Sequence, residues 1–296
     1  MKKLLYFCPL IILYLIFLIN STSQTKIYFD KKIAFEYLKK QCEFGPRNPS
    51  SKGHKACMNY LINEMKKFTK NVIVQKFTHY DSKIKKTLYM SNIIGTFSSS
   101  KSNAPRRILC AHWDTRPMAD KDPDIKNRNK PILGANDGAS GIAVLLEIAR
   151  IMSKSPPPLT IDIILFDGED YGEEGNYDEY FMGSRYFAQN PVFRGYEAAV
   201  LLDMIGDKNL QIPKEAFSNR YFPQLVNNIW NRANKLGIKQ FIHSVGFEIL
   251  DDHIMLAESG IPAIDIIDFD YKYWHTIQDT PDKCSPESLE AVGKVI

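Results

Sequence analysis

Cysteine is scarce in this 296-residue chain, and no two of its five cysteines have the Cys-x-x-Cys spacing of a structural zinc site. The sequence also lacks a basic stripe, and its formal net charge is only +4, so nothing in it indicates nucleic-acid binding. Internal repeats, low-complexity tracts and linkers are absent too, which argues against a repeat protein or several domains. A chain of this length can bury a sizeable core without disulfides.

One long apolar run stands at the N-terminus. Two lysines precede an unbroken apolar stretch at 4–19, and small polar residues follow it as far as Gln24. A basic start, an apolar middle and a polar end are typical of a secretory signal peptide. We therefore expect residues 1–24 to be removed on secretion or export to the periplasm, leaving 25–296 as the mature domain. The alternative is a retained signal anchor, because the run is close to the shortest length that spans a membrane. Only in that case would a membrane be a partner.

Four cysteines would remain in the mature chain. An even number permits disulfides in an exported protein, and a pair between Cys42 and Cys57 is one possibility. Free buried thiols are the equal alternative. The four are Cys42, Cys57, Cys110 and Cys284.

Helical and strand patterns alternate from Asp30 onward. Residues rich in β-branched and aromatic side chains predict strands, several of them with the near-continuous apolar character of buried central strands. Apolar residues three and four apart predict the helices. This alternation predicts a single α/β domain with a mixed, mostly parallel central sheet covered by helices on both faces. The first two strands follow each other directly and would form an antiparallel hairpin. The predicted strands are 72–77, 89–97, 107–112, 161–166, 198–202 and 263–267, and the main helices are 33–44, 56–68, 142–152, 221–236, 252–259 and 285–296.

Carboxylates and imidazoles follow one strand after another. In such sheets, ligands gather beyond the carboxyl ends of the strands, so we expect these side chains to converge. Each alone has an ordinary explanation, such as a helix cap for Asp137 or a solvated loop for Glu169 and Asp170. Their coincidence in five successive segments argues against that explanation. The residues concerned are His112, Asp114, Asp137, Glu169, Asp170, Asp203 and His275.

Two carboxylates and one imidazole give three ligands and leave zinc a fourth, open position, which is the arrangement of a catalytic site. Adjacent carboxylates can divide the work, because successive side chains leave an extended backbone in different directions. One of Glu169 and Asp170 could then bind the metal while the other acts as an acid or base.

At this level of detail the motifs resemble those of the zinc aminopeptidase clan. Within it they look most like bacterial-type glutaminyl-peptide cyclotransferases, and the resemblance spans about 30–296. It is carried by the sequence His-Trp-Asp-Thr-Arg-Pro at 112–117, the loop 134–141, the pair Glu169-Asp170, Leu-Leu-Asp-Met-Ile-Gly at 201–206, Asp-Asp-His-Ile at 251–254 and Trp-His-Thr at 274–276.

The resemblance implies an acyltransferase that converts the N-terminal glutamine of peptides and proteins into pyroglutamate and releases ammonia. One zinc ion per chain would be bound, and a general acid/base would act beside it within a carboxylate network. A tryptophan would line the substrate pocket. The implied roles are zinc ligands for Asp137, Asp170 and His275, acid/base for Glu169, network for Asp203 and Asp251, pocket wall for Trp274, structural support for His112 and Asp114, and a local helix start for Asp252 and His253.

Two departures from the animal cyclases stand out. Asp170 replaces their glutamate, which shortens the ligand by one methylene but keeps its oxygen and charge. Animal enzymes also have a pocket tryptophan shortly after the acidic pair, whereas 171–181 contains none. Tyr180 or Phe181 is the candidate to replace it.

The main rival interpretation is a di-zinc aminopeptidase that hydrolyses N-terminal residues. Every ligand type it needs is present, with His112 and Asp203 completing a second site. Trp274 and the stretches 201–206 and 251–254 favour the cyclase instead. A third interpretation is an ectodomain that keeps the fold only for protein binding, and the retention of every ligand and of Glu169 argues against it.

Overall fold

A computed structural model describes residues 28–101 and 103–296. The expected signal segment, 1–24, lies outside these residues. Among the helices that are described, none is both long and apolar enough to cross a membrane.

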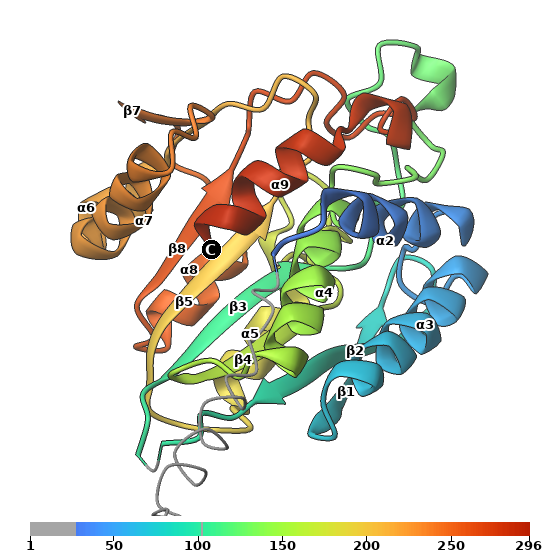
Figure 1. The fold of residues 1–296 in the computed structure, drawn as a ribbon. Coiled ribbons are helices and arrows are strands. Elements are labelled where there is room, and N and C mark those ends of the chain that lie inside the picture. The colour runs from blue at the N-terminus through green and yellow to red at the C-terminus, as the bar shows by residue number, and fades with distance from the viewer. Residues whose placement is uncertain (1–27, 102) are drawn as a thin grey trace, which may run out of the picture.

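A mixed sheet of six strands forms the centre of the described chain, in the order β1-β2-β4-β3-β5-β8 (Figure 1). β1 and β2 form an antiparallel hairpin, and β2 is also antiparallel to β4. The pairs β3–β4, β3–β5 and β5–β8 are parallel. The predicted mixed, mostly parallel sheet and the antiparallel hairpin are therefore confirmed. The strands are β1 (Val72–Asp81), β2 (Lys86–Phe97), β3 (Arg106–His112), β4 (Thr160–Phe166), β5 (Tyr196–Asp203) and β8 (Ala263–Ile267).

Helices cover both faces of this sheet, as predicted for a single α/β domain (Figure 1). On one face α4 packs on the central strands, and α2, α3 and α9 pack around α4. On the other face α5 contacts β2, while α8 contacts β5 and β8. The smaller elements β6, β7, α6 and α7 lie beyond β8. The helices are α2 (Lys31–Glu43), α3 (Lys52–Phe68), α4 (Ala139–Lys154), α5 (Met182–Gln189), α6 (Ala216–Tyr221), α7 (Pro223–Lys235), α8 (Asp252–Glu258) and α9 (Pro286–Val295); short 3-10 turns are η2 (Ile125–Asn127), η3 (Tyr177–Glu179) and η4 (Pro281–Lys283), and the small strands are β6 (Ile212–Lys214) and β7 (Phe241–Val245).

The core is divided in two by the sheet. In β4, Ile163 and Leu165 belong to the cluster under α4, and Ile164 and Phe166 belong to the cluster under α5 and α8. Because successive strand residues point to opposite faces, both sets are apolar when both faces are covered. This explains the near-continuous apolar run of β4. Burying each such side chain contributes roughly 1.5–3 kcal/mol before the entropic cost of ordering it.

The helix predicted at 221–236 is confirmed as α7, which begins at Pro223 and ends at Lys235. The preceding helix α6, which ends at Tyr221, was not predicted. Phe222 lies between them with φ −129° and ψ 49°, outside the helical region. A residue before proline is disfavoured in the α conformation, so the break falls there.

All four described cysteines are buried and free. The possible Cys42–Cys57 disulfide is therefore not formed in this structure. Burial raises the pKa of both thiols to about 12. Both thiols are therefore buried and unreactive.

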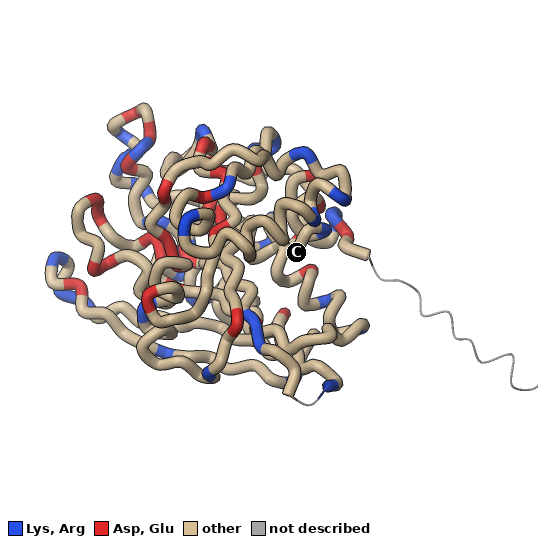
Figure 2. The backbone as a smooth tube through the Cα atoms, turned by 90° about the vertical axis from the view of Figure 1, so that its left-hand side faces the viewer, with Lys and Arg blue, Asp and Glu red and all other residues tan. Residues whose placement is uncertain are grey.

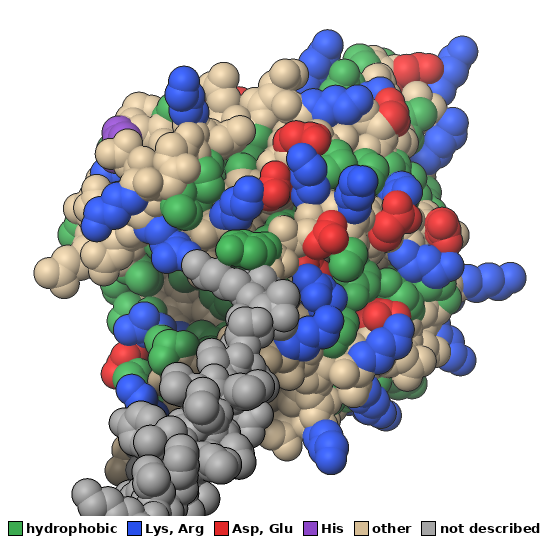
Figure 3. All heavy atoms as spheres, in the orientation of Figure 1, with side chains coloured by type: hydrophobic (Ala, Val, Ile, Leu, Met, Phe, Trp, Pro, Cys, Tyr) green, Lys and Arg blue, Asp and Glu red, His purple; other side chains and the backbone are tan. Residues whose placement is uncertain are grey.

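Acidic and basic residues are distributed differently. Figure 2 shows a group of Asp and Glu positions gathered in the interior of the molecule. Figure 3 shows the face formed by α2, α3 and α9, where Lys and Arg alternate with acidic side chains. Lys31 there lies 3.2 Å from Glu287, and Lys40 lies 2.7 Å from Glu43. This face is a mixed, solvated surface, and the unusual charges are the internal ones.

Candidate active site

The three predicted zinc ligands come from three different loops. Asp137 precedes α4, Asp170 follows β4 and His275 follows β8. His275 Nε2 lies 3.2 Å from Asp170 Oδ1 and 3.6 Å from Asp137 Oδ2. One potential ligand atom from each residue lies within 4.8 Å of the other two. The structure thus brings together side chains separated by up to half the chain.

These ligand atoms fit a divalent cation. Asp137 Oδ2 and Asp170 Oδ2 are buried and have no hydrogen-bond partner among the described residues. Leaving buried carboxylate oxygens unpaired is costly, whereas a metal ion would satisfy both of them. Two carboxylates and one imidazole also match the donor types of a three-ligand catalytic zinc site.

The loop before α4 is shaped to present Asp137. The carboxylate of Asp279 accepts hydrogen bonds from the backbone N–H groups of Asn136 (2.9 Å) and Asp137 (3.1 Å). Gly138 has φ +94°, and a Cβ at this position would lie 2.7 Å from the carbonyl oxygen of Asp114. Only glycine allows this close approach, so the turn into α4 is fixed.

Arg116 and Asp120 support the other two ligands. Arg116 donates to Asp170 Oδ1 at 3.1 Å and makes two 2.8 Å hydrogen bonds with Asp120. Asp120 Oδ1 in turn lies 3.4 Å from His275 Nδ1. A carboxylate next to the second nitrogen of a metal-binding histidine fixes the orientation of its ring. His275 itself has a left-handed backbone, with φ +53°.

The electrostatics of the group favour positive charge. Burial alone would lower the pKa of His275, but Asp170, Asp120 and Asp137 raise it to about 9. Burial tends to raise the pKa of Asp170, yet His275 and Arg116 outweigh it and lower that pKa. Burial and the charge of Asp170 raise the pKa of Asp137. A cation at the centre would replace the proton that these groups otherwise hold.

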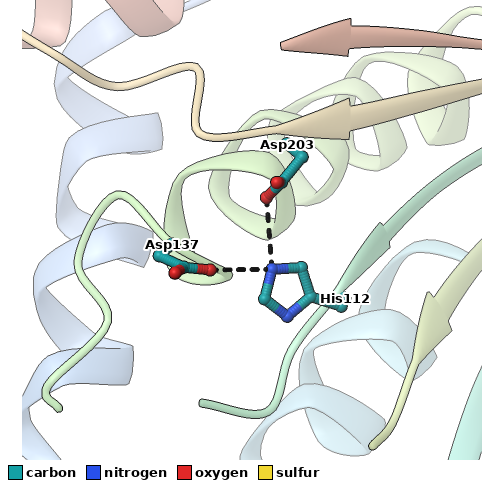
Figure 4. A group of neighbouring side chains, drawn as sticks. All are labelled: His112, Asp137 and Asp203. Atoms are coloured by element: carbon teal, nitrogen blue, oxygen red, sulfur yellow. Dashed lines mark hydrogen bonds and ion pairs between the residues drawn. The ribbon is translucent and has the colours of Figure 1, made fainter. Parts of the chain in front are cut away.

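A second group shares Asp137 (Figure 4). His112 Nε2 lies 3.2 Å from Asp137 Oδ1 and 3.1 Å from Asp203 Oδ1. Burial would lower the pKa of His112, but the carboxylates of Asp114, Asp137 and Asp203 raise it well above its usual value. An imidazole ring therefore stands between two carboxylates, among the residues that the di-zinc interpretation assigns to a second ion. The positions of His112, Asp137 and Asp203 are compatible with a protonated imidazole and equally with a second metal ion.

Glu169 lies beside both groups. Its Oε2 is 3.8 Å from His112 Nδ1, and its backbone N–H donates to Asp114 Oδ1 at 3.1 Å. Burial and the negative charge of Asp170 raise the pKa of Glu169 well above its ordinary range. Burial and the negative charge of Asp203 raise the pKa of Asp251 in the same way. Asp251 also caps α8, accepting the backbone N–H of Asp252 at 2.5 Å.

His253, Asp265 and Glu215 also belong to this polar cluster, although the sequence did not predict them there. Potential ligand atoms of Asp251, His253 and Asp265 lie within 4.8 Å of one another, and His253 Nε2 lies 3.5 Å from Glu215 Oε2. His253, expected only to serve a helix start, thus also links α8 to the N-terminal end of α6. The available signal for Asp265 was its carboxylate inside the apolar run of β8. Glu215 gave no such signal, because it caps α6 as an ordinary polar residue does.

A pocket of about 390 Å³ contains this chemistry. Its floor includes Asp137, Glu169, Asp170, Asp203, Asp251 and His275. Trp274 lines one wall and stacks on His275, with ring centroids 3.9 Å apart. Tyr180 and Phe181, the two candidates for the missing tryptophan, both line the pocket. A groove of about 850 Å³ between α3 and the β1–β2 hairpin is larger, but its lining holds lysines and a histidine rather than clustered carboxylates.

Most of the chain is similar to proteins of known structure or activity. The model of peptidase family M28 matches residues 92–296. A curated glutaminyl-peptide cyclotransferase from Bos taurus is 24% identical, covering 84% of this chain and 76% of that protein. The crystal structure of Bacteroides thetaiotaomicron glutaminyl cyclase bound to N-acetylhistamine is 41% identical with a TM-score of 0.85, covering 92% and 97% of the two chains. A leucine aminopeptidase precursor from the same organism is 40% identical with a TM-score of 0.86, covering 92% and 96%.

Proposed function

We propose that this chain, which belongs to peptidase family M28, is a zinc-dependent glutaminyl-peptide cyclotransferase acting on peptides and proteins with an N-terminal glutamine. The observation that carries the proposal is the single pocket in which Glu169, the group of Asp137, Asp170 and His275, and Trp274 all expose side chains. The extensive similarity to bacterial glutaminyl cyclases supports the same activity.

One zinc ion would be held by Asp137, Asp170 and His275. The unpaired carboxylate oxygens of this group and the support of His275 by Asp120 support this assignment. When bound, zinc would supply Lewis acidity to the side-chain amide oxygen of the substrate glutamine. In our proposal Arg116 and Asp279 hold the ligands in place, through Asp170 and the backbone of Asp137.

Glu169 would move the proton. The α-nitrogen of the substrate forms a bond to the side-chain amide carbon, the bond from that carbon to the amide nitrogen breaks, and ammonia leaves. The carboxylate of Glu169 accepts a proton from the α-nitrogen and returns it to the departing nitrogen. That exchange requires a raised pKa, which burial and the charges of Asp170 and Asp251 provide.

His112 would take the place of a second metal ion. Its protonated ring satisfies one oxygen of Asp137 and one of Asp203, so both acids are compensated without another ion. Asp203 and Asp251 would then act with Glu169 as a network of acids, in which burial and the charge of Asp203 raise the pKa of Asp251. No water molecule is activated in such a site, which suits cyclisation rather than hydrolysis.

A two-substrate assay tests this function. The purified protein is incubated with a glutamine-initiated peptide and, separately, with an aminoacyl-amide reporter. We expect ammonia and an N-terminally blocked product from the first and no amine release from the second. Release of free amino acids from varied N-termini, without a blocked product, would establish the aminopeptidase instead.

We also propose that residues 1–24 act as a signal peptide and that the mature enzyme is secreted or periplasmic. The support is the basic, apolar and polar succession at the N-terminus. N-terminal sequencing of protein recovered from outside the cytoplasm should find a start near residue 25. A full-length chain recovered with the membrane fraction would show that the segment is kept as an anchor.

A further inference from the structure

The larger groove, of about 850 Å³, plays no part in the proposed cyclase reaction. It lies where α3 packs beside β1 and β2 (Figure 1), and we call it the α3 groove. Its volume is in the range of ligand sites in proteins. Among the described residues that line it there is no Asp or Glu, whereas Lys52 and Lys55 of α3 and Lys76 of β1 all do so.

The charges of these three lysines are not compensated within the protein. All three are exposed, and none forms an ion pair with another described residue. By contrast, Lys67 near the other end of α3 lies 2.5 Å from Glu64. Lys52 and Lys55 are three residues apart in one helix, so they lie on the same side of it and repel each other. The α3 groove therefore carries an excess of positive charge.

The helix itself makes two of these positions unfavourable for lysine. Lys52 is the first residue of α3 and Lys55 the fourth, and the first turn contains no acidic residue. The N-terminal end of a helix carries the positive end of the helix dipole, so a lysine there is unfavourable and a carboxylate is favourable. An anion bound in the α3 groove would compensate for both the lysines and the dipole.

The inner end of the α3 groove is part of the packed core. His54 lines it and is only 3% exposed. Nε2 of this histidine lies 2.8 Å from Oδ1 of Asp167, and its ring stacks on Trp113 with the centroids 4.4 Å apart. Met90 also lines the groove, and its Sδ lies so close to Gly168 that a Cβ there would be 2.6 Å away. The α3 groove thus has a fixed inner wall.

Apolar and aromatic side chains extend from this wall to the surface. Phe77 and Tyr186 both line the α3 groove, and their rings stack with the centroids 5.0 Å apart. Met58 of α3 is partly buried in the lining, and Tyr89 of β2 is 71% exposed there. An apolar chain could be removed from water against these side chains while a charged end stays among the lysines.

The active-site pocket has the opposite charge. Several carboxylates line it, including those of Glu169 and Asp251, and no lysine or arginine does. The pocket therefore favours the protonated amine of a peptide, whereas the α3 groove favours an anion. The two cavities are suited to different molecules.

From these observations we propose that the α3 groove is a second ligand site, which binds an amphipathic carboxylate: a molecule with one carboxylate and an apolar chain. The carboxylate lies among Lys52, Lys55 and Lys76, and the chain lies against Met58 and Tyr89. This inference goes beyond the cyclase function and does not depend on it.

Three small ligands test which features are recognised. Octanoate has both the carboxylate and the chain, acetate lacks the chain, and 1-octanol lacks the charge. Each is titrated into the zinc-loaded protein in a calorimeter at low ionic strength. We expect saturable binding of octanoate, and binding of acetate and of 1-octanol that is at least roughly tenfold weaker.

Charge-reversal variants test the site. Lys52→Glu and Lys76→Glu should each weaken octanoate binding roughly tenfold. Because a carboxylate suits the start of a helix, Lys52→Glu should not lower the midpoint of urea unfolding, and weaker binding would not then reflect a damaged fold. The matched control is Lys66→Glu, which is exposed in the last turn of α3 and lies outside the groove. It should bind octanoate as the wild type does.

Each contrary result identifies a different error. If 1-octanol binds as tightly as octanoate, the lysines do not select an anion, and if acetate does so, the groove does not hold a chain. Binding that persists in both Lys52→Glu and Lys76→Glu but is lost in His275→Ala would place octanoate at the proposed zinc site. Any of these results overturns the inference. Octanoate binding that depends on the lysines supports it even if the protein does not cyclise glutamine.

Discussion

Glu169 and Asp170 are neighbours in the sequence with opposite electrostatic surroundings. Burial and the charge of Asp170 raise the pKa of Glu169, whereas His275 and Arg116 outweigh burial and lower the pKa of Asp170. Two adjacent carboxyl groups whose pKa values are pushed apart can take different roles. Asp170 remains an anion suited to a metal ion, and Glu169 becomes a group suited to carrying a proton.

Glu169→Gln tests this division of roles. Because the amide cannot exchange the proton, kcat/KM for a glutamine peptide should fall by about 10²–10⁴-fold. Zinc content should be unchanged, since Glu169 is not a proposed ligand. The control is Glu173→Gln, in the same loop and half exposed, which should retain full activity. Zinc loss in Glu169→Gln would show that Glu169 is itself a ligand.

Asp268 gives a pH-dependent prediction away from the metal ligands. Burial raises its pKa to about 6 from an ordinary value of 3.8, although the backbone N–H of Gln211 donates to it at 2.9 Å. The folded state therefore holds this proton more tightly than the unfolded chain. The contribution of Asp268 to stability is full below its unfolded pKa and is lost as pH rises through about 6.

Asp268→Asn should remove that loss and keep the acceptor for Gln211. We expect the variant and the wild type to unfold with similar free energies near the ordinary pKa of 3.8. At neutral pH the variant should be more stable by about 1–2 kcal/mol. Urea unfolding at the two pH values measures the difference. A difference that does not change with pH would contradict the raised pKa.

Among the structural elements, the long connection from β3 to α4 is fixed by one buried arginine. Arg47, from the segment between α2 and α3, donates to the carbonyl oxygens of Trp113 (3.0 Å), Leu133 (2.8 Å) and Gly134 (2.7 Å). These contacts hold both ends of the connection. Its last residues include Asp137, so Arg47 determines where one proposed ligand lies.

Arg47→Met should therefore affect both stability and metal affinity. Three carbonyl oxygens would lose their donor, which we expect to cost about 3–5 kcal/mol. Zinc affinity, measured by competition with a chelator, should fall roughly tenfold to a hundredfold. The control is Arg107→Met, because Arg107 is exposed and its one ion-pair contact, with Glu197, is long at 3.5 Å. Unchanged zinc affinity in Arg47→Met would show that the contacts of Arg47 with this connection do not affect metal binding.

Strands could be predicted from the sequence where the side chains on both of their faces are buried. The apolar runs of β4, β5 and β8 reveal strands because both of their faces are covered. α5 was missed because its eight residues mix polar and apolar side chains over barely two turns. β7 was missed since three of its five residues are exposed, which removes the apolar signal. Short elements at the periphery depend on their neighbours more than on their own sequence.

For the molecule as a whole, the topology carries most of the information about the site. A parallel sheet brings the carboxyl ends of its strands to one edge, so Asp137, Asp170, Asp203 and His275 could be predicted to converge. Asp279, Arg116 and Glu215 could not, because nothing in the sequence places them beside those residues. Their roles come from tertiary contacts between loops that are far apart in the chain.

The same topology leaves the number of metal ions as the central question. Asp137 belongs to two groups, one completed by Asp170 and His275 and the other by His112 and Asp203. The proposed single-zinc cyclase would hold an ion only in the first, with His112 serving the second. The rival di-zinc peptidase would hold an ion in each.

Zinc content per chain tests this point most directly. The mature protein, saturated with zinc and then freed of excess by gel filtration, is analysed beside His112→Ala and His275→Ala, with folding checked by circular dichroism. We predict one zinc ion per chain in the wild type and in His112→Ala, and almost none in His275→Ala. Two ions in the wild type, with one lost in His112→Ala, would contradict a single-zinc cyclase.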